Sequence, residues 1–210
     1  MRRMICGVLV LLALFAAPHQ SAAAGSWNAT VSGGASVPTG DFGDKAKGYA
    51  QAGWSIGGSM DYMYTDQWAF GGDGSWNSNS SGNEGAVFSG STLEKDKFSV
   101  WQLGAHAKYF FPMAAQAPVK WYGLMGASLY GFKNDQTWNT GGTTTESSSS
   151  DKRAGTKLGL GGTYWQNSQV GWDFGADYNL AFLDKDQSSS SSLSYLGLHA
   201  GVTFNIPQAK

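Results

Sequence analysis

One segment near the C-terminus alternates between apolar and polar residues over an unusual length. Between Gln169 and Phe182 the even-numbered positions are all apolar or aromatic: Val170, Trp172, Phe174, Ala176, Tyr178, Leu180 and Phe182. The odd-numbered positions are all polar or small. Successive side chains of a β-strand point to opposite faces, so this pattern predicts one long strand with an apolar face and a polar face. It exceeds the ~5–6 residues of typical soluble strands and suffices for a tilted strand to cross a bilayer, which takes ~9–11 residues.

The same alternation recurs along the chain and predicts eight strands. Their expected ranges are 27–37, 49–64, 68–77, 98–111, 119–133, 155–165, 169–182 and 193–206. The segment 119–133 is mostly apolar at both alternating sets of positions, so the pattern does not decide which of its faces is polar. The connections are alternately long and short, and the long ones, such as 78–96 and 134–154, are rich in Ser, Gly, Thr or Asn and are predicted to be loops.

These features predict an all-β fold, an eight-stranded antiparallel up-and-down transmembrane β-barrel with short periplasmic turns and long extracellular loops. Outer-membrane barrels have this distribution of turns and loops, and an even strand number leaves both termini on the short-turn side. A soluble sandwich or barrel is the alternative interpretation, but it would expose long charged side chains on its polar face. Here that face is mostly Gly, Ser, Asn and Asp, which suits a cramped interior better.

Aromatic residues gather at the strand ends nearest the termini and the short turns. Trp and Tyr rings favour the interface between lipid and water. We therefore expect an interface girdle made by Trp27, Tyr64, Trp68, Tyr109, Phe111, Trp121, Tyr164 and Phe204. A second girdle at the long-loop end would use Tyr49, Trp76, Phe98, Tyr130 and Phe182.

The N-terminus has the organisation of a secretory signal peptide. Arg2 and Arg3 precede an apolar run over 4–17, and small residues at 22–24 supply a cleavage site. We expect Sec-type export, removal of 1–24, and a barrel domain over 25–210 in the outer membrane of a Gram-negative bacterium. Cys6 would leave with the leader, so no thiol or disulfide chemistry is expected. The formal net charge of −1 gives no nucleic-acid footprint.

Two segments carry a resemblance to a known group of proteins. The segment 33–44, GGASVPTGDFGD, resembles the first strand and loop of small outer-membrane barrels, the superfamily that includes OmpA-, OmpX- and OmpW-type barrels. Gly201, Phe204 and Ile206 look like the closing-strand signal read by the barrel-assembly machinery, although Pro207 follows where many such chains end on an aromatic. The resemblance implies that the partners are outer-membrane lipids and lipopolysaccharide, periplasmic chaperones and that assembly machinery, and that the protein is a monomer.

Charged and histidine side chains at polar-face positions are the candidates for the barrel lumen. They are Asp61, Asp73, His106, Lys108, Lys157, Asp173, Asp177 and His199. If the strands around Asn167 pair symmetrically, Lys157 lies opposite Asp177, and we expect an ion pair there. Such pairs plug a narrow pore, because a buried charge is costly unless it is compensated. The alternatives are charges solvated by lumen water, and a water path left by the many lumen glycines.

A structural or surface role without enzymatic activity is the predicted function. A narrow porin-like passive channel for ions or small solutes is the alternative. A more distant alternative is a lipid A-modifying barrel enzyme, which would depend on His106 or His199, but neither belongs to a Ser–acid arrangement of those enzymes. Two histidines on separated strands are a weak basis for a metal site, so neither a metal nor a cofactor is expected.

Overall fold

The computed structural model describes residues 24–43, 50–81, 84–113, 117–182 and 192–207. Apart from Ala24, the predicted signal peptide lies outside these residues, as does the connection 183–191. The strands within the described residues are β1 (Trp27–Thr39), β2 (Ala50–Met63), β3 (Trp68–Ser81), β4 (Val87–Phe88), β5 (Ser91–Phe110), β6 (Val119–Thr140), β7 (Thr143–Trp165), β8 (Val170–Phe182) and β9 (Ser192–Ile206). A short 3₁₀ helix, η2 (Gly40–Gly43), follows β1. In this part of the chain no helix is long and apolar enough to cross a membrane.

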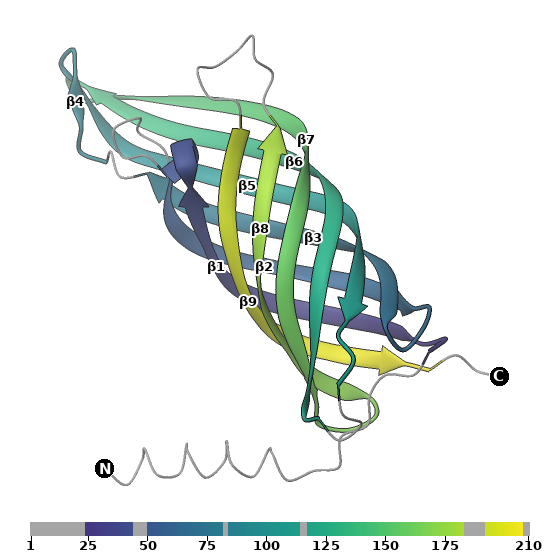
Figure 1. The fold of residues 1–210 in the computed structure, drawn as a ribbon. Helices are drawn as coiled ribbons and strands as arrows, with labels where there is room; N and C mark the ends of the chain where they lie inside the picture. Colours follow the sequence, from purple (N-terminus) through teal and green to yellow (C-terminus); the bar gives the residue numbers. More distant parts are fainter. Residues whose placement is uncertain (1–23, 44–49, 82–83, 114–116, 183–191, 208–210) are drawn as a thin grey trace, which may run out of the picture.

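The strands close into a ring of antiparallel neighbours. The sheet order is β3-β2-β1-β9-β8-β7-β6-β5-β4, and a further pairing of β3 with β5 closes the barrel. The eight-stranded up-and-down barrel is therefore confirmed, with β4 as a two-residue addition in the described part of the connection between β3 and β5. Figure 1 shows the tilted strands, with the start of β1 and the end of β9 at the end of the barrel that carries the short turns.

The alternation of side chains between the two faces is preserved through the barrel. Leu160 and Val31, on apolar sets, are 66% and 61% exposed on the outside. The strand that the sequence could not orient is β6, and here the structure decides. Tyr122 and Tyr130 are buried in the interior while Leu129 is exposed, so the even-numbered residues of β6 face inward.

The predicted loops over 78–96 and 134–154 are largely strands, so that prediction was wrong. β5 begins at Ser91, and β6 and β7 form one long hairpin that turns at Gly141 and Gly142, with positive φ at both. Such a two-residue turn matches the twist of paired strands. The hairpin end is solvated on both faces, since 143–150 are all exposed, so no apolar alternation marks it in the sequence.

These strands build an extension beyond the barrel wall. It consists of β4, residues 91–96 of β5, 134–140 of β6 and 143–154 of β7. The last pairs that tie it to neighbouring barrel strands are Ser80 with Lys97 and Gly155 with Ala181. Figure 1 shows this extension projecting from the upper end of the barrel.

Two apolar clusters occupy the interior, one near each end. The long-loop cluster consists of Phe42, Ala50, Val100, Tyr130, Phe132, Ala181 and Tyr195, with Phe98 and Leu193 packed against it. The turn-side cluster consists of Met63, Ala69, Phe110, Tyr122 and Trp165, with Leu124 packed against it. Phe98 and Tyr130 therefore lie inside and not in an outer girdle, while Trp76 and Phe182 are exposed and Tyr49 lies outside the described residues.

The expected turn-side girdle needs one correction. Tyr64, Trp68, Phe111, Trp121 and Phe204 are exposed, and Trp27 and Tyr109 are partly exposed. Tyr164 is only 6% exposed, although it belongs to the same alternating set of β7 as Leu160. Its register partners are Val119 on β6 and Trp172 on β8. Tyr164 is therefore buried within the wall and presents little of its ring to lipid.

Candidate functional site

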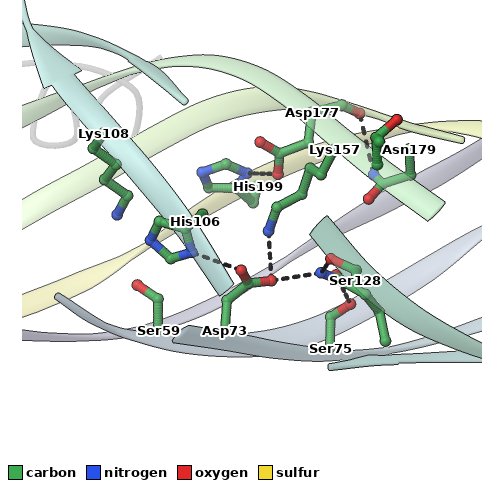
Figure 2. Close-up of polar contacts among 12 residues, drawn as sticks. Ser59, Asp73, Ser75, His106, Lys108, Ser128, Lys157, Asp177, Asn179 and His199 are labelled. Carbon is green, nitrogen blue, oxygen red and sulfur yellow. Dashed lines mark hydrogen bonds and ion pairs between the residues drawn. The ribbon is translucent and has the colours of Figure 1, made fainter. Parts of the chain in front are cut away.

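The polar middle of the lumen is the candidate functional site. It lies between the two apolar clusters and holds all eight charged or histidine residues predicted to face inward. They come from β2, β3, β5, β7, β8 and β9. On each of these strands every second side chain points into the lumen, and these residues occupy such positions. Figure 2 shows the side chains of Asp73, Lys157 and His199 pointing toward one another across the lumen.

One half of the site is organised around two carboxylates that bracket an imidazole. His106 Nε2 lies 2.5 Å from Asp61 Oδ1, and His106 Nδ1 lies 2.7 Å from Asp73 Oδ1. Lys108 Nζ donates to Asp61 Oδ2 at 2.7 Å. Lys157 Nζ donates to Asp73 Oδ2 from the other side of the lumen, a contact visible in Figure 2. Each carboxylate therefore contacts two cationic or imidazole groups.

The other half repeats this arrangement on β8 and β9. His199 Nε2 lies 3.4 Å from Asp173 Oδ1, and His199 Nδ1 lies 3.2 Å from Asp177 Oδ2. Asp173 also accepts hydrogen bonds from Tyr122 Oη at 3.0 Å and from Thr163 Oγ1 at 2.8 Å. Lys108 Nζ lies 5.1 Å from the centre of the Tyr122 ring, a cation–π distance. Tyr122 and Lys108 thus connect the two halves.

Neutral side chains complete the network, and sequence reasoning missed most of them. Gln102 donates to Asp73 Oδ2 at 2.7 Å and to Ser128 Oγ at 2.9 Å, while Ser75 donates to Gln102 Oε1 at 3.1 Å. Tyr122 and Ser128 lie on β6, whose facing the alternation did not decide. Gln102 lies between the apolar residues Trp101 and Leu103, so the alternation gives its facing, but nothing local identifies its partners.

The predicted pair of Lys157 with Asp177 is wrong. The hairpin between β7 and β8 is not symmetric about Asn167, because Gln166 and Asn167 both donate backbone hydrogen bonds to Val170 O. This turn shifts the register by two residues, so Lys157 lies opposite Asn179, and Asp177 opposite Gly159. The side chains of Lys157 and Asp177 both point into the lumen, as predicted. Lys157 pairs with Asp73, and Asp177 pairs with His199.

The charges of the site balance when both imidazoles are protonated. A carboxylate oxygen only accepts hydrogen bonds, so an imidazole with a carboxylate at each nitrogen is satisfied when both nitrogens carry a proton. His106 and His199 both have this environment. The four carboxylates then face two lysines and two imidazolium groups. Mutual compensation of this kind is what makes charge tolerable inside a protein.

Among the described residues, two small cavities lie in the lumen. The larger, about 90 Å³, is lined by residues that include Asp73, His199 and Tyr195. The smaller, about 10 Å³, lies beside Met63 of the turn-side cluster. Binding sites for small organic molecules usually measure ~300–1,000 Å³, so neither cavity has the volume of such a site.

Several lumen glycines give room to the side chains of the network. A Cβ atom at Gly161 would lie 2.5 Å from the Tyr122 ring, and one at Gly175 would lie 2.9 Å from His199 Cε1. A Cβ atom at Gly159 would collide with the carboxylate of Asp177. These positions are glycine because a long side chain from the next strand occupies the space above them.

The arrangement offers little for catalysis or metal binding. The Ser59 hydroxyl donates to Asp61 Oδ2 at 3.3 Å, so it contacts a carboxylate and not an imidazole that could act as a base. Across the residues that the structure describes, no group of three or more His, Cys, Asp or Glu side chains could hold a metal ion. In the described lumen, the charged side chains are thus engaged with one another, and the Ser59 hydroxyl belongs to the same network.

Comparisons with known proteins place this geometry among bacterial membrane barrels. The family model for the outer membrane protein beta-barrel domain matches residues 7–207. Among solved structures, OprG from Pseudomonas aeruginosa is similar with a TM-score of 0.59 and 14% identity, over 90% of this chain and 100% of that chain. Neisserial surface protein A is similar with a TM-score of 0.53 and 22% identity, over 88% and 99%.

A third similar structure extends the range of sources. A major outer membrane protein from Thermus thermophilus gives a TM-score of 0.55 at 12% identity, over 86% of this chain and 99% of that chain. No curated protein sequence matches the chain significantly. At these identities, the structural similarities establish the fold alone.

Proposed function

Because this chain belongs to the outer membrane protein beta-barrel domain family and resides in the outer membrane, we propose that it is a closed barrel with a structural and surface role and no enzymatic activity. The observation that carries the proposal is the filled lumen. An ion network spans its middle, and an apolar cluster lies on each side of that network.

The compensated charges support a closed state. A solute crossing the lumen would have to separate Asp73 from Lys157 and Asp61 from Lys108, whose side chains are each less than a tenth exposed. Removing one partner of a buried pair typically costs ~3–5 kcal/mol. Thermal opening of a whole network of such pairs is therefore expected to be rare.

The histidines support a role without catalysis. A general base needs a free acceptor nitrogen near the proton that it removes. In His106 and His199, both ring nitrogens lie against carboxylates. A lipid-modifying activity would therefore require this network to open first. We expect His106→Ala and His199→Ala to lower the stability of the barrel. We expect no deacylase or acyltransferase activity on lipid A from the unchanged protein, and therefore none to be lost in these variants.

The extension supports a function at the cell surface. It projects from the end that carries the long connections, and its tip bears Val87 and Phe88, which are 69% and 74% exposed. Exposed apolar side chains on paired strands suit contacts outside the membrane. We therefore propose that the structural role belongs to the barrel and the surface role to the extension.

Single-channel conductance of the mature protein tests the closed state. The folded protein, verified by heat-modifiable gel mobility, is inserted into planar bilayers beside a heat-unfolded sample. We expect no discrete current steps from the folded protein. Steps that vanish on unfolding would reject the closed barrel in favour of the second candidate, a narrow passive channel.

One observation favours that second candidate. The two lumen cavities share Thr30, Lys108 and Asp173 in their linings, so they approach each other along the barrel axis. Rearrangement of Lys108 alone could join them into a polar path. If current is found, Lys108→Gln is expected to change its ion selectivity, because it removes a cation that lines both cavities.

The partners remain proposals of the same kind. We propose that outer-membrane lipids and lipopolysaccharide surround the exposed apolar band, and that periplasmic chaperones and the barrel-assembly machinery deliver and fold the chain. We further propose a monomer, because the ring of pairings from β3 to β5 is closed and leaves no barrel edge for a second chain.

A further inference from the structure

A groove on the outer wall of the barrel is separate from the lumen network and from the turns. It crosses β2, β1, β9 and β8, has a volume of about 500 Å³, and is lined mainly by apolar atoms. We call it the lipid-side groove. Its outward-facing lining includes Val31, Gly33, Trp54, Ile56, Trp172 and Ala200.

The floor of the groove consists of small residues in direct register. Gly33 of β1 pairs with Ile56 of β2 on one side and with Ala200 of β9 on the other, and Ala200 pairs with Phe174 of β8. Neighbouring strands lie ~4.8 Å apart, so the backbones of β2 and β8 are separated by roughly 14 Å, with only the small residues Gly33 and Ala200 between them at this register. The depression follows from the absence of side-chain bulk at these two positions.

The smallness of Gly33 is not required by the fold. Most barrel glycines stand where a Cβ atom would collide with a neighbouring strand, as at Gly34. At Gly33 the nearest atom to an added Cβ is Ser55 O at 3.7 Å, an ordinary contact distance. A larger residue would therefore fit the barrel, and what glycine provides here is the open groove itself.

The chemistry of the groove selects a hydrocarbon. Its backbone groups at Gly33 are paired with strands on both sides, and its walls are the rings of Trp54 and Trp172 and the side chain of Ile56. Inside a bilayer no water is present to fill such a depression. A second barrel is a poor occupant, since a two-fold contact would place one concave surface against another.

We propose that the lipid-side groove binds one acyl chain of an outer-membrane lipid in a defined position. The chain lies over Gly33 and Ala200, between the walls that carry Trp54 and Trp172. This site lies on the outside of the barrel, so it does not depend on whether the lumen is closed.

Photocrosslinking from lipid to protein tests the proposal. The mature protein is folded in vesicles of phosphatidylethanolamine and phosphatidylglycerol that contain a trace of phosphatidylcholine with a diazirine midway along one acyl chain. After illumination, mass spectrometry maps the labelled peptides. Gly33→Leu fills the floor of the groove. Gly74→Leu makes the same change at another outward position with open space, where the nearest atoms to a Cβ are Gln102 O at 3.5 Å and Leu103 Cδ1 at 3.8 Å.

We expect labelling to concentrate on β1 near Val31 and on β9 near Ala200, to fall several-fold in Gly33→Leu, and to persist in Gly74→Leu. Labelling spread evenly around the barrel, or unchanged by Gly33→Leu, would overturn the proposal. A protein–protein crosslink through the groove that Gly33→Leu abolishes would overturn it in favour of a second copy. Heat-modifiable mobility verifies folding, and Ala200→Leu replaces Gly33→Leu if the latter does not fold.

Discussion

Asp73 illustrates how one side chain can hold several strands together. It lies on β3 and contacts His106 and Gln102 of β5 and Lys157 of β7, which approaches from across the lumen. Its side chain is 9% exposed. A carboxylate in this position is stabilised by its donors, and they in turn depend on its charge.

Asp73→Asn is expected to lower the free energy of unfolding by ~3–5 kcal/mol, because Lys157 and His106 would lose their compensating charge in a buried site. Urea unfolding of the protein in lipid vesicles, followed by tryptophan fluorescence, measures this loss.

A matched control lies in the extension. Asp135 accepts a hydrogen bond from Lys133 at 2.8 Å, which holds the pKa of its carboxyl below the ordinary value, but both side chains are well exposed. Exposed pairs contribute ~0.2–1 kcal/mol, so Asp135→Asn should have little effect. Similar small losses in both variants would mean that the lumen network does not stabilise the barrel.

β9 is the element that closes the barrel. It pairs with β8 on one side and with β1, from the other end of the chain, on the second side. Gly201 faces inward, where a Cβ atom would collide with the backbone of Val31, while Phe204 and Ile206 face outward and are exposed. The predicted assembly signal is thus divided between a residue needed for close strand pairing and two that are accessible from outside.

Phe204→Ala is expected to reduce the amount of barrel assembled in the outer membrane of growing cells much more than its stability in vitro. Phe70→Ala is the control, since Phe70 is outward-facing and 49% exposed, close to the 45% of Phe204. Quantitative blotting of heat-modifiable barrel in outer-membrane fractions measures assembly. Equal assembly of the two variants would count against Phe204 as part of the signal.

The extension should be separable from the barrel. Gln136 and Ser147 are direct register partners, so residues 137–146 can be replaced by an Asn-Gly turn between them. Most of the removed residues are exposed or half-exposed. They pair within the extension, and none of them pairs with β3 or β8. We expect the free energy of unfolding to change by less than about 0.5 kcal/mol, as for other surface changes. A variant that cannot fold in vesicles would show that the extension is needed to form the barrel.

At the scale of the whole molecule, the barrel interior is filled at three levels. The long-loop cluster lies nearest the extracellular end, the ion network lies in the middle, and the turn-side cluster lies nearest the periplasm. Each level is built from inward residues of strands that are far apart in sequence. We expect that opening one level leaves the other two in place.

This layering predicts that single changes do not create a channel. Tyr130→Ala, which opens the long-loop cluster, and the double variant Asp73→Ala with Lys157→Ala, which opens the network, should each stay silent in planar bilayers. A variant that combines these changes with Phe110→Ala should give discrete current steps. Conductance from Tyr130→Ala alone would show that the network does not block ions, and silence of the combined variant would show that the lumen closes by repacking.

The sequence by itself determined the class of fold, the barrel strand count and the inward set of residues. These depend on the period of two, which is a local property of every strand, as in the alternation of Trp172 with Asp173. The sequence prediction failed where this alternation is absent. Both sets of β6 are mostly apolar, and the end of the β6–β7 hairpin is solvated on both faces.

Only the tertiary structure decided which side chains contact one another. The turn at Gln166–Gln169 moved the register by two residues and so separated Lys157 from Asp177, and closure of the barrel brought Lys157 to Asp73, 84 positions away. Likewise, Tyr164 belongs to the outward set but is buried between β6 and β8. Facing is set by each strand alone, whereas partners depend on register, tilt and closure, which are properties of all eight strands together.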